Sequence, residues 1–187
     1  FHSYYMSLLR KNLIVLIGFM GAGKSTVALA LANKLGFETI DTDEEIVKQQ
    51  QMPISKIFEI HSEKQFRKYE TELIHRLLKK TNTVVSIGGG LPCSFHNIEL
   101  LKDRALLIYL KLDAKILSNR LWNGRRQRPL IAHYNDIYDL ESYVEQLLKE
   151  RSPYYEMADI IIDASGSVED TVDLIIEQWH SYQENPQ

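Results

Sequence analysis

The chain contains the run Leu13-Ile14-Val15-Leu16-Ile17-Gly18-Phe19-Met20-Gly21-Ala22-Gly23-Lys24-Ser25, around which the remaining elements must be arranged. Its first five residues are all apolar and predict a strand that is buried on both faces. Glycines then interrupt the apolar run, and residues 25–35, which are rich in Ala and Leu and precede Gly36, predict a helix. A buried strand, a glycine-rich loop and a helix in this order indicate an α/β fold.

The glycine-rich loop also matches the phosphate-binding pattern G-x-x-x-x-G-K-[ST] at every fixed position from Gly18 to Ser25. Its backbone N–H groups and the helix N-terminus favour anions, and Lys24 can reach the outer phosphates of a nucleotide. The Ser25 hydroxyl is expected to bind Mg²⁺. A glycine turn that only caps a helix is the alternative, but the flanking strand and helix favour a nucleoside triphosphate site. The dinucleotide pattern G-x-G-x-x-G is not satisfied.

Further strands are predicted at residues 37–40, 83–87, 105–110 and 159–162, with helical patterns between them. Helices are expected at about 43–50, 54–60 and 62–79. This alternation favours a five-stranded parallel sheet with helices on both faces, because each parallel crossover must return along a face of the sheet. The length of 187 residues fits one domain, and residues 1–10 are expected to lie outside the fold as an added or frayed terminus.

Composition excludes several classes of function. The net charge of −3 gives no global attraction to nucleic acid or anionic lipid. No apolar run approaches the roughly 20 residues of a membrane span, and the single cysteine, Cys93, excludes an internal disulfide. The spacing of the histidines does not support a transition-metal site. We therefore expect a soluble, cytoplasmic protein, and we separately expect it to be a monomer.

Three classes of nucleotide-binding protein compete: a GTPase switch, an ATPase motor module and a small-molecule kinase. A GTPase needs the guanine-selecting pattern N-K-x-D, and residues 33–36 lack its Asp. A motor needs further domains, for which 187 residues leave no room. A kinase acting on a small molecule is the favoured interpretation.

Two acids, Asp41 and Asp43, follow the second predicted strand, where open α/β sheets bind their ligands. In an extended chain, side chains two residues apart point the same way, so one acid could serve Mg²⁺ and its waters and the other the hydroxyls of a substrate. Helix capping is an alternative that can hold at the same time. Asp163 is a rival metal acid at the end of the fifth strand, without a second acid beside it.

Two arginines and a run of glycines suggest a site for a small carboxylate. Arg67 has Glu63 four residues before it and Glu70 three residues after it, which could orient its guanidinium, although a surface charge ladder has the same spacing. Arg151 continues an apolar helical stripe, so it needs an anionic partner, either a bound carboxylate or Asp41 or Asp43. At residues 88–90, three glycines allow a ligand to approach bare backbone, or form only a flexible turn.

Between Trp122 and Asn135 the helical pattern lapses, and four arginines lie within nine residues: Arg120, Arg125, Arg126 and Arg128. A nucleic-acid patch would need a basic surround and stacking aromatics, which this segment lacks apart from Trp122. We expect residues 122–135 to form a mobile lid whose arginines stabilise phosphoryl charge while closure excludes water.

Taken in order, the segments Gly18–Thr26, Asp41–Asp43, Phe66–Glu70, Gly88–Gly90, Arg128–Leu130 and Arg151–Tyr154 resemble those of shikimate kinase over about residues 11–175. The resemblance implies a P-loop kinase fold and Mg²⁺-dependent transfer of phosphate from ATP to the 3-hydroxyl of shikimate, giving shikimate 3-phosphate and ADP in chorismate and aromatic amino-acid biosynthesis. It also implies the following roles: Lys24, Asp41 and Arg128 catalytic; Gly21, Ala22, Gly23, Lys24, Ser25, Thr26, Arg120 and Arg128 on ATP; Asp43, Arg67, Gly88, Gly89, Gly90 and Arg151 on shikimate; Ser25 and, through water, Asp41 on the metal.

The chain departs from the family pattern at two places. Ser62-Glu63 stands where the family often has Gly-Glu, and residues 164–167 lack an arginine that relatives can place beside adenine. Two other functions remain open at this point. A different small-acceptor kinase, such as a gluconate kinase, predicts activity on acceptors without a ring. A catalytically silent nucleotide-binding module predicts ATP affinity without acceptor-dependent ADP release.

Overall fold

The structure is a computed structural model that describes residues 12–128 and 130–184. The N-terminal segment predicted to lie outside the fold falls outside these described residues. The strands are β1 (Leu13–Ile17), β2 (Glu38–Asp41), β3 (Thr83–Ser86), β4 (Leu106–Lys111) and β5 (Ile160–Asp163). The helices are α2 (Lys24–Leu35), α3 (Thr42–Gln50), α4 (Ile54–Leu77), α5 (Asn97–Arg104), α6 (Ala114–Gly124), α7 (Ile137–Tyr155) and α8 (Val168–Glu184), with short 3₁₀ turns η1 (Leu91–Cys93) and η2 (Arg125–Gln127).

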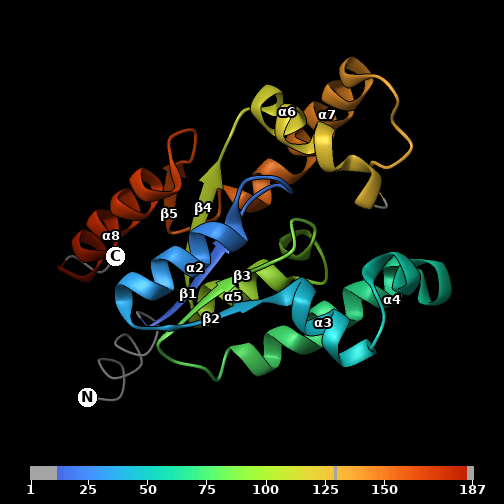
Figure 1. Ribbon diagram of the computed structural model, residues 1–187. Helices are drawn as coiled ribbons and strands as arrows, with labels where there is room; N and C mark the ends of the chain where they lie inside the picture. Colours follow the sequence, from blue (N-terminus) through green and yellow to red (C-terminus); the bar gives the residue numbers. More distant parts are fainter. Residues whose placement is uncertain (1–11, 129, 185–187) are drawn as a thin grey trace.

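The five strands form one parallel sheet in the order β2-β3-β1-β4-β5. The central strand β1 pairs with both β3 and β4, and all five of its residues are buried, as its continuous apolar sequence predicts. Helix α2 lies in front of the sheet beside α8, and α5 lies behind it (Figure 1). The prediction of a parallel sheet covered on both faces is confirmed.

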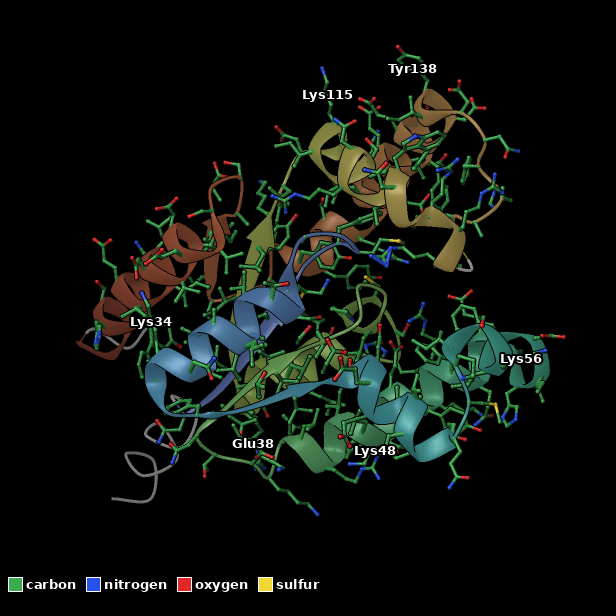
Figure 2. All side chains as sticks on the ribbon, in the orientation of Figure 1. Lys34, Glu38, Lys48, Lys56, Lys115 and Tyr138 are labelled. Atoms are coloured by element: carbon green, nitrogen blue, oxygen red, sulfur yellow. The ribbon has the colours of Figure 1, made fainter. Side chains whose placement is uncertain are left out.

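Helix α2 contacts α8 through its C-terminal end and the residues that follow it. The Lys34 ammonium lies 2.6 Å from an Asp173 carboxylate oxygen, and the ring of Phe37, which follows α2, packs edge-on against Trp179 at 6.1 Å between centroids. Figure 2 places Lys34, Glu38, Lys48, Lys56, Lys115 and Tyr138 on the periphery of the molecule. All six side chains are exposed. No helix in the described part of the chain is both long enough and apolar enough to cross a membrane.

One predicted boundary is wrong in an informative way, and another is confirmed. Asp41 ends β2 and Thr42 already begins α3, so Asp41 and Asp43 do not lie on one extended segment. The two helices expected at 54–60 and 62–79 are found as the two arms of α4, which meet at a kink at the non-helical residue Ser62. Helix α3 begins early because its first N–H groups find a capping acceptor in Asp41.

Two helical pairs stand over the carboxyl ends of the strands. Helices α3 and α4 pack together on one side, and α6 and α7 pack together on the other (Figure 1). The loop between β1 and α2 opens between these pairs. Parallel strands bring their carboxyl ends to one edge, so the predicted phosphate loop, the acids after β2 and the glycines after β3 meet there.

Candidate active site

Lys24 is the buried centre of the phosphate loop. Its ammonium donates to the carbonyl oxygens of Gly18 at 2.9 Å and Phe19 at 2.8 Å. Burial lowers the pKa of Lys24 to about 8, while Asp43 and Asp41 act in the opposite direction. Gly23 caps α2 with φ at 88°, a left-handed conformation that residues with a Cβ rarely adopt. The loop therefore presents a cation and a helix N-terminus at the same place.

Asp41 contributes both of its carboxylate oxygens to local structure. Oδ1 accepts the N–H of Asp43 at 2.9 Å and of Glu44 at 3.4 Å, which caps α3, and Oδ2 accepts from the Ser25 hydroxyl at 2.5 Å. The Ser86 hydroxyl lies 3.2 Å from that of Ser25. Capping and proximity to the phosphate loop thus occur together. The hydroxyl and carboxylate oxygens are hard donors of the kind that Mg²⁺ prefers, so these residues fit the ion.

Asp43 lies in the first turn of α3 and is partly buried. Its Oδ1 is buried and has no hydrogen-bond partner among the described residues. Burial raises the pKa of Asp43, and Asp41 adds to this shift, while Lys24, Arg67 and Arg128 oppose it. A ligand hydroxyl that donates to this oxygen would satisfy it.

A cavity of about 380 Å³ lies between the two helical pairs, and a second of about 390 Å³ surrounds the phosphate loop. The two share Met20, Asp43, Gly88, Gly89 and Arg128 in their walls. Ligand groups bound in the two cavities can therefore meet at Asp43. The first cavity is also lined by Val47, Pro53, Ile54, Ser55, Phe58, Phe66, Arg67, Glu70, Gly90, Leu130 and Arg151, and the second by Gly21, Gly23, Lys24, Ser25, Thr26, Asp41, Ser86, Ile87 and Arg120.

Arg67 is held in the first cavity by the two acids that the sequence spacing predicts. Its guanidinium donates to Glu70 at 2.8 Å and to Glu63 at 2.9 Å. Burial works against its charge, but the two carboxylates outweigh it and raise the pKa of Arg67. A Cβ on Gly90 would lie 2.5 Å from the guanidinium, so a larger residue there would displace Arg67 from its present position. The side chain is one-eighth exposed, at 12%, which argues against a surface charge ladder.

Glu70 is the site residue whose environment the sequence does not reveal. Its side chain is fully buried, and burial raises its pKa to about 7 despite the opposing charge of Arg67. Its Oε1 has no hydrogen-bond partner in the described part of the chain. The spacing from Arg67 predicts their contact, but it carries no information on depth. The apolar wall made by Phe58 and Phe66 was likewise not predicted as part of the site.

Arg151 enters the same cavity from α7. Its guanidinium carbon lies 5.7 Å from the centre of the Phe19 ring. Within residues 12–128 and 130–184, neither Asp41 nor Asp43 forms an ion pair with it, so these acids are not the partners considered from the sequence. One turn later, the Tyr155 hydroxyl donates to the Gly89 carbonyl at 2.6 Å and ties α7 to the glycine run. Gly88 lines both cavities, but its N–H already donates to the Thr42 hydroxyl at 3.1 Å.

The four clustered arginines separate into two pairs. Arg125 stacks over the Trp122 ring at 3.5 Å and donates to the Tyr134 carbonyl at 2.9 Å. Arg126 donates to the Asn135 side chain at 3.0 Å. These two hold the segment between α6 and α7 together. Arg120 and Arg128 instead line the cavity around the phosphate loop.

The comparisons with known proteins identify the family of this chain. The family model for shikimate kinase matches residues 20–180. The shikimate kinase of Caldicellulosiruptor bescii is 40% identical over 150 residues, which cover 80% of this chain and 84% of that protein. This chain belongs to the shikimate kinase family. The family resemblance predicted from the sequence motifs is thereby confirmed.

Other members and solved structures give the same result. The shikimate kinase of Thermodesulfovibrio yellowstonii is 37% identical over 167 residues, covering 89% of this chain and 94% of that protein. The structure described as shikimate kinase from Acinetobacter baumannii in complex with shikimate superimposes with a TM-score of 0.85 at 31% identity, covering 97% of this chain and 99% of that one. A gluconokinase from Sinorhizobium meliloti, with a TM-score of 0.60 at 20% identity, shares the fold alone.

Membership defines the reaction. Kinases of this family use ATP to phosphorylate an alcohol group of shikimate, and the chain is an enzyme of this class. The kinase interpretation reached from the sequence is therefore confirmed.

Proposed function

We propose that the chain transfers the γ-phosphoryl group of MgATP to the 3-hydroxyl of shikimate, releasing shikimate 3-phosphate and ADP. The observation that carries this proposal is the pair of adjoining cavities that share Asp43 and Arg128. One contains the phosphate loop and the other contains two arginines suited to a carboxylate. Donor and acceptor can therefore meet without leaving the protein.

The nucleotide is assigned to the cavity around Lys24. The loop residues Gly21, Ala22, Gly23, Ser25 and Thr26 would hold its phosphates through backbone N–H groups and hydroxyls. Arg120 would face the nucleotide from α6. Lys24 and Arg128 would stabilise charge on the phosphoryl group as it transfers. Most of the catalysis is then positioning and electrostatics, as in other phosphoryl transfers.

Mg²⁺ is assigned to the Ser25 hydroxyl and, through water, to Asp41. When bound, the ion would neutralise charge on the phosphate oxygens. Asp41 holds Ser25 through a hydrogen bond of 2.5 Å, so this acid orients the proposed metal ligand as well as capping α3. Its catalytic part in this proposal is to order the waters of the metal.

The acceptor is assigned to the cavity between the helical pairs. Arg67 and Arg151 would bind its carboxylate, because a planar guanidinium matches a carboxylate in two parallel hydrogen bonds. Asp43, which lies in the wall that the two cavities share, would accept a hydrogen bond from the 3-hydroxyl. Gly89 and Gly90 would offer backbone N–H groups, and Gly88 would contribute its bare surface. Since the walls of both cavities come from one chain, we also propose that the single domain acts as a monomer.

The test measures ADP formation in a coupled enzyme assay with MgATP. It compares the wild type and Asp43→Ala, each with and without shikimate. We expect shikimate-dependent ADP in the wild type and its near-complete loss in the variant. Gluconate in place of shikimate should give none. Equal ADP formation under all conditions would defeat the proposal.

Arg151→Ala tests the acceptor assignment separately. Loss of a charge-assisted interaction should raise the KM for shikimate by about 10- to 100-fold and leave the KM for ATP nearly unchanged. Arg104→Ala, which removes an exposed arginine at the end of α5, is the matched control and should behave as the wild type. A selective loss of ATP affinity in Arg151→Ala would show that the assignment of Arg151 to the acceptor is wrong.

A further inference from the structure

Ser62 has a backbone conformation that a serine side chain strongly disfavours. It interrupts α4 with φ at 71° and ψ at 159°, a region that is populated almost only by glycine. Its side chain is exposed, and its hydroxyl forms no hydrogen bond within the described part of the chain. Nothing in the side chain therefore compensates the strain, which must be balanced by contacts elsewhere.

The kink at Ser62 determines the shape of the acceptor cavity. Before it, Ile54, Ser55 and Phe58 line the cavity, and after it, Phe66, Arg67 and Glu70 line the same cavity. Figure 1 shows α4 changing direction between its short N-terminal part and its longer C-terminal part. In a straight helix, Phe58 and Phe66 would be about 12 Å apart along the axis, so the kink is what allows their rings to meet.

Two contacts bridge the kink. The rings of Phe58 and Phe66 meet edge-to-face at 5.1 Å between centroids, with an interplanar angle of 74°. His61 Nδ1 lies 2.8 Å from the Tyr69 hydroxyl, in a hydrogen bond whose direction depends on the tautomer of the histidine. Both contacts join residues from opposite sides of Ser62, so they favour the kinked conformation over a straighter one.

We infer that Ser62 is a strained positioning residue whose kink sets the aperture of the acceptor cavity, and that the His61–Tyr69 hydrogen bond keeps it in place. The inference rests on the proposed function for the identity of the acceptor, shikimate. Molecules in which the kink relaxes would have the Phe58 wall turned away from Arg67. Apparent affinity for shikimate falls in proportion to the fraction of such molecules.

The first measurement isolates the strain. Ser62→Gly removes the Cβ that disfavours this conformation, whereas Ser62→Ala removes only the hydroxyl and keeps the strain. We expect the Gly variant to melt about 2 to 5 °C above the Ala variant, because relief of strain outweighs the extra freedom that glycine has in the unfolded chain. The Ala variant should melt with the wild type. Equal melting temperatures of the two variants would overturn the inference.

The second measurement isolates positioning. Tyr69→Phe removes one hydrogen bond across the kink and should raise the KM for shikimate about fivefold, with kcat and the KM for ATP unchanged. Adding Ser62→Gly to Tyr69→Phe should return the KM for shikimate to within about twofold of the wild type, while adding Ser62→Ala should not.

Failure of rescue, or equal changes in both KM values, would show that the kink has a structural role only. The absence of shikimate-dependent ADP in the wild type would instead refute the proposed function. Because the melting temperatures need no substrate, the two failures are distinguishable.

Discussion

Glu70 illustrates, for a single residue, how burial and ion pairing compete at this site. The carboxylate has an arginine at 2.8 Å, yet its pKa is raised to about 7 from 4.5 because it is removed from water. Asp43 adds a like charge that reinforces the shift. The folded protein therefore holds this proton to a higher pH than the unfolded chain does.

The free energy of unfolding is predicted to fall as the pH rises from about 4.5 to about 7. Between pH 4.5 and 7 the folded state binds more protons at Glu70 than the unfolded state, so ionising it costs about 3 kcal/mol by pH 8. Glu70→Gln should remove this contribution. Urea unfolding at pH 5 and pH 8 measures it as the difference between the two proteins' changes in free energy of unfolding. Parallel changes in both proteins would contradict the prediction.

For single residues, the sequence predicted those side-chain contacts in the candidate site that depend on residue spacing along a helix, and no others. The contacts of Arg67 with Glu63 and Glu70 follow from helical periodicity and are found at 2.9 and 2.8 Å. Burial of Glu70 depends on which helices pack above it, and no local pattern carries that information. The Phe58–Phe66 wall was not predicted for the same reason.

Among the elements, the start of α3 shows how one side chain can overrule an expected extended segment. The sequence suggested that Asp41 and Asp43 would project in parallel from a strand. Asp41 instead accepts two backbone N–H groups, at 2.9 and 3.4 Å, so helix formation begins at Thr42. Both acids still reach the cavity around the phosphate loop, by different routes.

Substitutions at Asp41 should separate its capping role from its proposed role at the metal. Asp41→Asn keeps an oxygen for capping but loses the charge, whereas Asp41→Ala loses both. We expect Asp41→Ala to lower the free energy of unfolding by about 1 kcal/mol and Asp41→Asn to leave it nearly unchanged. Both should lower kcat at least about tenfold at fixed Mg²⁺. Thermal unfolding and the dependence of kcat on Mg²⁺ concentration are the measurements, and an unchanged Mg²⁺ dependence in Asp41→Asn would contradict the proposed role.

Across the whole molecule, the active site depends on two helical pairs that stand on either side of the phosphate loop (Figure 1). The alternation of strands and helices predicted the parallel sheet. It could not predict the order β2-β3-β1-β4-β5, because strand order depends on contacts between residues far apart in sequence. Nor could the sequence show which of the four clustered arginines hold the segment between α6 and α7 and which face the cavity.

That division predicts different outcomes for two arginine variants. Arg128→Ala removes a group that lines the cavity around the phosphate loop and is proposed to stabilise the transferring phosphoryl group, so it should lower kcat by about 100-fold or more. Arg125→Ala loses the Trp122 stacking and the bond to the Tyr134 carbonyl, so Arg128 is less well positioned. We expect it to lower kcat about 3- to 10-fold and to raise the share of ADP formed without shikimate.

The coupled enzyme assay, with Arg104→Ala as the control, checks both variants. An Arg125→Ala enzyme that matches the control in rate and in shikimate dependence would show that the stacked arginine has no part in positioning.

Helix α7 connects the arginine-rich segment after α6 to the acceptor cavity. It begins after the segment fastened by Arg125 and Arg126, and it ends beside Arg151 and the Tyr155–Gly89 hydrogen bond. A helix of 19 residues is a stiff rod of about 28 Å. A tilt that moves its first turn, next to the segment carrying Arg128, must also displace the end that carries Arg151. The two substrates should therefore bind cooperatively, each altering the affinity for the other by the same factor.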